Sequence, residues 1–174
     1  RKMAYCRYKT NKKSKFLQQY HPSLMDKDAI KNDVKLDDNM IVTGPNAAGK
    51  TTLIKSTIVN LILSQQLGCG FYKSANVNPY QYIHCYLNIP DTSGRDSLFQ
   101  AEARRCKEIL DKVYKNSDKR HFCIFDELYS GTNPYEAVAS AYGYLNYLVK
   151  EDNCNYILTT HFINLCSLME NKNN

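Results

Sequence analysis

The stretch Gly44-Pro45-Asn46-Ala47-Ala48-Gly49-Lys50-Thr51 decides the fold class of this 174-residue chain. It satisfies the P-loop pattern GxxxxGK[ST], in which backbone N–H groups surround phosphate oxygens. The apolar run at 40–43 precedes it and predicts a buried strand, while apolar residues recur at helical spacing over 51–66. A strand, a glycine turn and a helix in this order favour phosphate binding at the start of the helix.

Individual positions in this stretch have distinct expected roles. Lys50 is predicted to reach the β- and γ-phosphates, and the Thr51 hydroxyl to ligate Mg²⁺. Gln66, which closes the helix, is assigned to sensing the metal or the attacking water, and the alternative is a solvated helix end. The predicted ligands are therefore ATP and Mg²⁺. The other expected ATP contacts are Gly44, Pro45, Asn46, Ala47, Ala48, Gly49 and Thr52.

Strands and helices alternate along the rest of the chain. This alternation implies crossover connections and predicts an α/β fold of the P-loop NTPase type, with a mostly parallel sheet flanked by helices. Strands are expected at 82–88, 121–125 and 155–159, and helices at 97–114 and 135–149.

Polar side chains follow two of these strands. Asp126 and Glu127 come directly after the apolar run 121–125, and His161 follows 155–159. Because the carboxyl ends of parallel strands share one edge of a sheet, these side chains are expected beside the glycine turn. Asp126 is predicted to hold Mg²⁺, Glu127 to orient and deprotonate the attacking water, and His161 to contact the γ-phosphate.

The net charge of +6 is concentrated at the start of the chain. The remaining residues are close to neutral, so residues 1–19 are interpreted as a basic arm that is flexible or belongs to a preceding domain. Contact of this arm with DNA is the alternative. Within the first 15 residues there is no acidic side chain, and the basic ones are Arg1, Lys2, Arg7, Lys9, Lys12, Lys13 and Lys15.

The seven cysteines are scattered without a CxxC pair, which indicates reduced thiols in an intracellular protein. No signal-peptide pattern and no apolar run of about 20 residues occurs, so a membrane partner is not expected. A zinc site at His84, Cys85, His121 and Cys123 is disfavoured, because neighbouring strand residues face opposite ways. Core packing explains these residues, and also the dispersed tyrosines.

Several segments carry the motifs of one family in the right order. They are Val42 to Thr51, which is similar to TGPNxxGKS/T; Gln66-Leu-Gly-Cys, similar to QIG; Asp126 to Glu136, similar to DExxxGTxxxE/D; Thr160-His161-Phe162, similar to THY/F; and the upstream pairs His21-Pro22 and Asn32-Asp33. From about Tyr20 to Leu165 the chain thereby resembles the ATPase domain of the MutS family of DNA mismatch repair proteins, within the wider ABC-type ATPases.

The resemblance also implies a dimer in which each subunit completes the other's site. The family's signature GxSTFxxE is similar to the segment from Gly94 to Glu102, with one extra residue before Ser97 and Leu98 in place of Thr. Ser97 is thereby expected to contact the γ-phosphate held by the partner, and Asn133 is assigned to the same surface. Ile30 stands near the family's adenine-stacking aromatic position and is expected to cover the base.

The implied function is that of an ATPase domain over 20–174, without the family's C-terminal dimerisation tail. ATP would close a homo- or heterodimer through the ATPase face, and double-stranded DNA would be bound by domains outside this chain. Two alternatives stay open: an ATP-binding scaffold without turnover, and another ABC-type ATPase subunit without mismatch recognition. A transporter subunit fits poorly, since no LSGGQ segment occurs.

Overall fold

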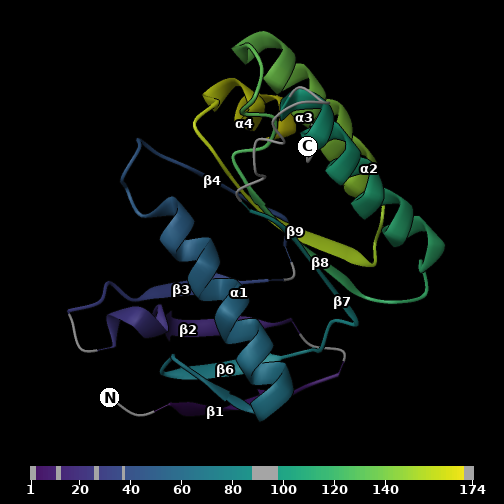
Figure 1. Ribbon diagram of the computed structural model, residues 1–174. Coiled ribbons are helices and arrows are strands. Elements are labelled where there is room, and N and C mark those ends of the chain that lie inside the picture. The colour runs from purple at the N-terminus through teal and green to yellow at the C-terminus, as the bar shows by residue number, and fades with distance from the viewer. Residues whose placement is uncertain (1–2, 11–12, 26–27, 37, 88–97, 171–174) are drawn as a thin grey trace.

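The computed structural model describes residues 3–10, 13–25, 28–36, 38–87 and 98–170, which form two β-sheets and their helices (Figure 1). The strands are β1 (Ala4–Tyr8), β2 (Lys15–Gln19), β3 (Asn32–Lys35), β4 (Met40–Thr43), β5 (Cys69–Gly70), β6 (Ser74–Val77), β7 (Tyr82–Tyr86), β8 (His121–Asp126) and β9 (Cys154–Thr160). The helices are a 3₁₀ turn (Pro22–Leu24), α1 (Lys50–Leu67), α2 (Leu98–Lys115), α3 (Pro134–Leu148) and α4 (Ile163–Glu170).

A parallel sheet in the order β4-β9-β8-β7 carries the strands expected from the sequence. Each neighbouring pair in it is parallel, for example Ile41 beside Leu158 and Asp126 beside Thr159. The mixed α/β class with a parallel sheet and flanking helices is therefore confirmed. The carboxyl ends of β4, β9 and β8 come together at one edge of this sheet.

Strand β8, inside the parallel sheet, is buried on both faces, which explains its continuous apolar run 122–125. Successive residues of β8 point to opposite faces. Phe122 and Ile124 pack in the core on the α1 side, while Cys123 and Phe125 pack in the core under α2, α3 and α4. All four side chains are fully buried.

The second sheet includes two segments of the stretch 1–19, for which the sequence predicts a flexible arm or part of a preceding domain. It has the order β3-β2-β6-β1-β5 and is mixed, because β1 runs parallel to β6 while β2 runs antiparallel to both β3 and β6. A flexible arm is wrong for residues 4–8 and 15–19, which form β1 and β2. Phe16 is 1% exposed and stacks on Tyr72 with ring centroids 5.4 Å apart.

Helix α1 joins the two sheets into one core. Its residues Ile54, Ile58 and Leu61 are buried in a cluster that includes Phe16 of β2 and Phe122 of β8. In Figure 1 the helix lies across the N-terminal sheet, with the strands of the parallel sheet beside it.

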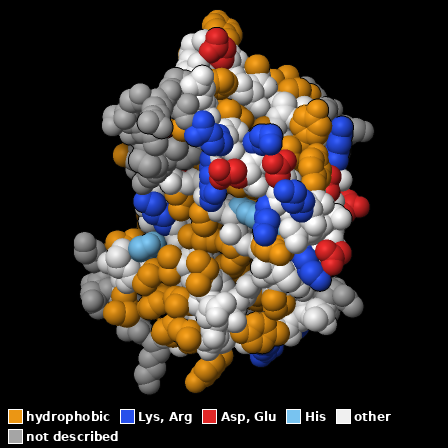
Figure 2. All heavy atoms as spheres, turned by 45° about the vertical axis from the view of Figure 1, so that its right-hand side comes forward, with side chains coloured by type: hydrophobic (Ala, Val, Ile, Leu, Met, Phe, Trp, Pro, Cys, Tyr) orange, Lys and Arg blue, Asp and Glu red, His pale blue; other side chains and the backbone are white. Residues whose placement is uncertain are grey.

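The outer face of α2 is charged but of mixed sign. Figure 2 shows basic and acidic side chains interspersed on the face turned toward the viewer. Along α2, Arg105 pairs with Glu108 at 3.2 Å and Lys107 with Asp111 at 3.1 Å. Within the described ranges, no helix combines the length and apolarity needed to cross a bilayer.

Candidate functional site

The loop between β4 and α1 curls around the ammonium group of Lys50. Ala47 and Gly49 have positive φ of 62° and 89°, and Gly49 caps the helix without a side chain. Glycine adopts this left-handed conformation at little cost, so the turn can be tight. The Lys50 Nζ donates to the Gly44 carbonyl at 2.8 Å and to the Pro45 carbonyl at 3.1 Å. Lys50 is 8% exposed and is thus held inside the loop.

Thr51 in the first turn of α1 meets Asp126 at the end of β8. The Thr51 hydroxyl lies 3.2 and 3.1 Å from the two carboxylate oxygens of Asp126. The fully buried Thr159 of β9 donates a further hydrogen bond from its hydroxyl to Asp126 Oδ1, at 2.5 Å. A hydroxyl and a carboxylate are hard oxygen ligands of the kind Mg²⁺ binds, with water and phosphate completing its shell. Thr51 and Asp126 are therefore suited to hold that ion.

Glu127 faces Lys50, at the start of α1, and His161, which follows β9. Its Oε1 lies 3.9 Å from Lys50 Nζ and 3.9 Å from His161 Nδ1. Its backbone has a positive φ of 52°, and its N–H donates to the Thr159 carbonyl at 3.0 Å. The three residues that the sequence placed after β4, β8 and β9 do meet at one edge of the sheet.

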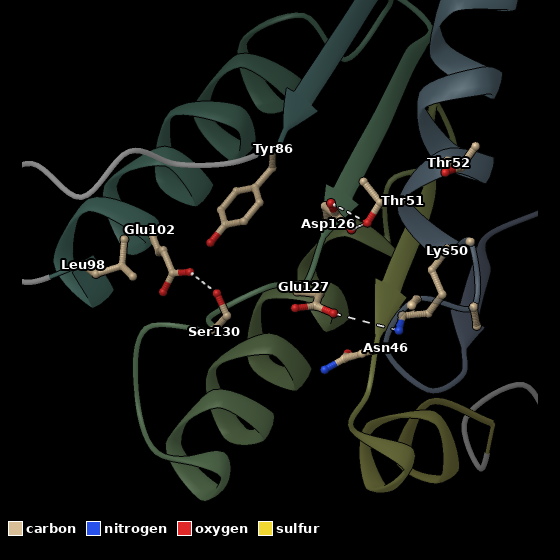
Figure 3. A pocket seen from close by; sticks show the side chains of 13 residues that line it. Asn46, Lys50, Thr51, Thr52, Tyr86, Leu98, Glu102, Asp126, Glu127 and Ser130 are labelled. Carbon is tan, nitrogen blue, oxygen red and sulfur yellow. Dashed lines mark hydrogen bonds and ion pairs between the residues drawn. The ribbon is translucent and has the colours of Figure 1, made fainter. Parts of the chain in front are cut away.

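Lys50, Asp126 and Glu127 line one cavity of about 670 Å³ (Figure 3), whereas His161 lies beside Glu127 and lines a neighbouring hollow with Phe162. The cavity wall includes Asn46, Ala47, Ala48, Gly49, Lys50, Thr51, Thr52, Asp126 and Glu127, all of them predicted site residues. Figure 3 also shows Tyr86, Glu102 and Ser130 on the side of the cavity away from Lys50. Burial, followed by the charge of Glu102, raises the pKa of Tyr86, which therefore stays a neutral hydroxyl.

Comparison with known proteins assigns the chain to a family. Residues 40–174 match the family described as MutS domain V. The chain belongs to the MutS family. It is 30% identical over 155 residues, or 87% of its length, to a DNA mismatch repair protein MutS of Prochlorococcus marinus. It is 32% identical over 145 residues, 80% of its length, to the DNA mismatch repair protein Msh3 of Dictyostelium discoideum.

A third relative in the MutS family carries a different name. The chain is 28% identical over 146 residues, 82% of its length, to an Endonuclease MutS2 of Lactobacillus helveticus. The matched parts make up 16%, 10% and 18% of these three relatives, so the chain spans less than a fifth of their lengths.

The remaining predicted residues of this MutS domain V chain lie elsewhere. Ile30 is 83% exposed and lines a second hollow of about 460 Å³, whose wall shares Ala48, Gly49, Lys50 and Thr52 with the first cavity. Asn133 is the N-cap of α3, where its side chain accepts from the Glu136 N–H at 3.1 Å. Ser97 lies outside the described residues. The structure does not bring Gln66 to the cavity: the helical rise separates it from Lys50 by about 24 Å, and it is exposed.

Sequence reasoning missed four residues that shape this MutS site: Tyr86, Glu102, Ser130 and Thr159. Glu102 belongs to the segment quoted for the family signature, and Thr159 precedes the predicted His161 by two residues. Their positions near recognised motifs were the available signal. Their contacts join β7, α2, β8 and β9, and such contacts depend on how the elements pack.

Proposed function

We propose that this chain is the ATP-binding and ATP-hydrolysing domain of a MutS-like DNA mismatch repair protein. The observation that carries the proposal is the single cavity shared by the Lys50 loop, the Thr51–Asp126 pair and Glu127. A phosphate cradle, a pair of oxygen ligands and a carboxylate beside them are what hydrolysis of a nucleoside triphosphate needs. The family match and the printed names of two relatives support the assignment.

Each residue then has a chemical task. The N–H groups of the P-loop 44–51, the start of α1 and Lys50 bind the phosphates, since all present positive charge. Thr51 and Asp126 hold Mg²⁺, which supplies charge neutralisation on the phosphate oxygens when bound. Glu127 accepts the proton of the attacking water, and His161, 3.9 Å from Glu127, contacts the γ-phosphate.

The complete site requires a second subunit in this proposal. The side chain of Glu127, in the cavity wall, is 37% exposed, and that of His161, beside it, is 46% exposed, so this edge of the site is open to solvent where a partner's surface can cover it. Ser97 and Asn133 would contribute from the partner of a homo- or heterodimer. Double-stranded DNA would be bound by domains outside this chain, and closure of the dimer would change their position.

A second candidate is the same ATPase coupled to a DNA substrate other than a mismatch. The relative named Endonuclease MutS2 favours it, because its 28% identity is close to the 30% and 32% of the mismatch repair relatives. The same cavity serves both candidates. Only the DNA that stimulates turnover separates them.

The test is ATP turnover by the purified protein with homoduplex, mismatched and branched DNA at one stated salt concentration. Glu127→Gln keeps the shape of the side chain but removes the base, so we expect turnover to fall about 100-fold or more while ATP stays bound. The control is Glu108→Gln, an exposed carboxylate on α2. Unchanged turnover in Glu127→Gln refutes the role of Glu127, and stimulation by branched DNA alone favours the second candidate.

A further inference from the structure

The loop that follows Glu127 is held in a conformation that its residues do not favour. Glu127 and Tyr129 both have positive φ, 52° and 58°, although neither is glycine. Such backbone costs about 1 kcal/mol or more per residue and persists only where neighbouring groups hold it. The loop is therefore defined by its contacts, and these contacts set where the Glu127 side chain points.

Glu102 of α2 supplies two of those contacts. It accepts from the Ser130 hydroxyl through Oε1 at 3.3 Å and from the Gly131 N–H through Oε2 at 3.1 Å. Glu102 is 2% exposed, while Ser130 and Gly131 are exposed, so both hydrogen bonds are partly buried. A hydrogen bond to a carboxylate is about twice as strong as a neutral one.

The same segment of α2 packs directly on the loop backbone. A Cβ at Gly131 would lie 2.6 Å from Leu98 Cγ, closer than real Cβ atoms approach, and 3.0 Å from Glu102 Oε2, which is a tight contact. Glycine at 131 thus permits the first two turns of α2 to touch the loop. In the same loop, the Tyr129 N–H donates a long hydrogen bond to the Tyr86 hydroxyl at 3.5 Å. The start of α2 and the loop after Glu127 are fastened to each other at adjacent residues.

We propose that Glu102 is a positioning residue, which clamps the 127–131 loop to the start of α2 and thereby orients Glu127. The inference rests on the proposed ATPase function. Glu102 touches no reacting atom in this proposal. It acts through the Ser130 and Gly131 contacts, so that a displacement of the start of α2 would be transmitted to the Glu127 carboxylate.

The test compares Glu102→Ala, Glu102→Gln and the exposed control Glu108→Ala in the full protein. Removing both acceptors in Glu102→Ala should lower kcat by about tenfold or more with little change in KM for ATP. Glutamine keeps one acceptor for the Gly131 N–H and offers an amide to Ser130, so it should restore most of kcat. Ser130→Ala, which removes only one hydrogen bond, should give a smaller loss and covers the case in which Glu102→Ala does not fold.

Amide hydrogen exchange provides a readout that does not depend on turnover. Exchange of the Ser130–Gly131 segment should be about tenfold faster in Glu102→Ala than in wild type, and near wild type in Glu102→Gln. Unchanged exchange, or a kcat equal to wild type in Glu102→Ala, overturns the clamp. A wild-type protein without ATPase activity overturns the proposed function instead, and the exchange data alone then decide the clamp.

Discussion

Replacing Thr159 with valine tests how the acidic end of β8 is held. Valine has the shape of threonine but no hydroxyl, so the variant removes the hydrogen bond to Asp126 Oδ1 and leaves the packing intact. The Glu127 N–H keeps its bond to the Thr159 carbonyl at 3.0 Å, so no backbone donor is orphaned. Asp126 also keeps its Thr51 contact. The loss is therefore the hydrogen bond to the partly buried Asp126 carboxylate, about 1.5–3 kcal/mol, together with the longer contact from the Glu127 N–H to the Thr159 hydroxyl at 3.3 Å.

Urea unfolding followed by circular dichroism at pH 7 measures this loss, provided that the slope with urea stays constant. For a chain of this size, the same loss lowers Tm by about 3–12 °C. Thr159→Ser is the matched control, since it keeps the hydroxyl and removes a methyl group worth about 1 kcal/mol.

The relative stability of the valine and serine variants shows whether the hydrogen bond or apolar burial dominates at position 159. Burial of apolar surface alone makes valine the more stable variant, whereas the hydrogen bond makes serine the more stable one. In an Asp126→Ala background the valine substitution should cost much less, because only the longer contact with the Glu127 N–H remains to be lost. A valine variant as stable as wild type, or an unchanged cost without Asp126, refutes the reasoning.

Two further predictions concern packing and pH. Gly131→Ala should destabilise the protein by about 1–3 kcal/mol in thermal unfolding, because its Cβ would meet Leu98 Cγ at 2.6 Å. The double variant with Leu98→Ala should recover part of that loss. If the two single-variant losses simply add in the double variant, the predicted clash is contradicted. Burial, and second the nearby His121, lower the pKa of His84 from 6.5 to about 4. The unfolded chain therefore takes up this proton at a higher pH than the folded protein, and stability falls as pH drops from about 6.5 to 4. His84→Gln should flatten this dependence of the unfolding free energy on pH, and an equally steep profile would exclude His84 as its source.

The parallel sheet could be predicted because its strands are buried on both faces. Residues 121–125 form an unbroken apolar run, and the structure places them in β8 with full burial. The helix expected at 135–149 is α3 at 134–148, where Pro134 follows the Asn133 cap. Long apolar or strongly periodic segments record their burial in the sequence itself.

The N-terminal sheet could not be predicted in the same way. Its strands have two to five residues, and in β2 the exposed Lys15 stands beside the buried Phe16. Alternation over so few residues, within a run of basic side chains, is hard to distinguish from a solvated tail. Only pairing with β3 and β6, which lie distant in sequence, makes residues 15–19 a strand.

The site residues also fall into two groups, those that local sequence patterns predict and those that depend on packing. Lys50, Asp126, Glu127 and His161 follow β4, β8 and β9, so the parallel register predicts that they meet. Gln66 closes α1 as the sequence indicated, and the rise of the helix therefore places it away from the cavity. The Glu102–Ser130 contact joins residues 28 positions apart in packed elements, which no local pattern encodes.

The core shared by the two sheets extends beyond the residues that match the family model. The family match begins at residue 40, yet Phe16, Val34 and Leu36 are buried in the same cluster as Ile54 of α1 and Ile157 of β9. A recombinant protein that begins at residue 40 would contain every residue of the cavity. It would nevertheless expose to water the apolar face of α1 that packs against the N-terminal sheet. Ala4 and Cys6 of β1 also pack against this cluster, so a domain boundary for expression or excision must be drawn before β1.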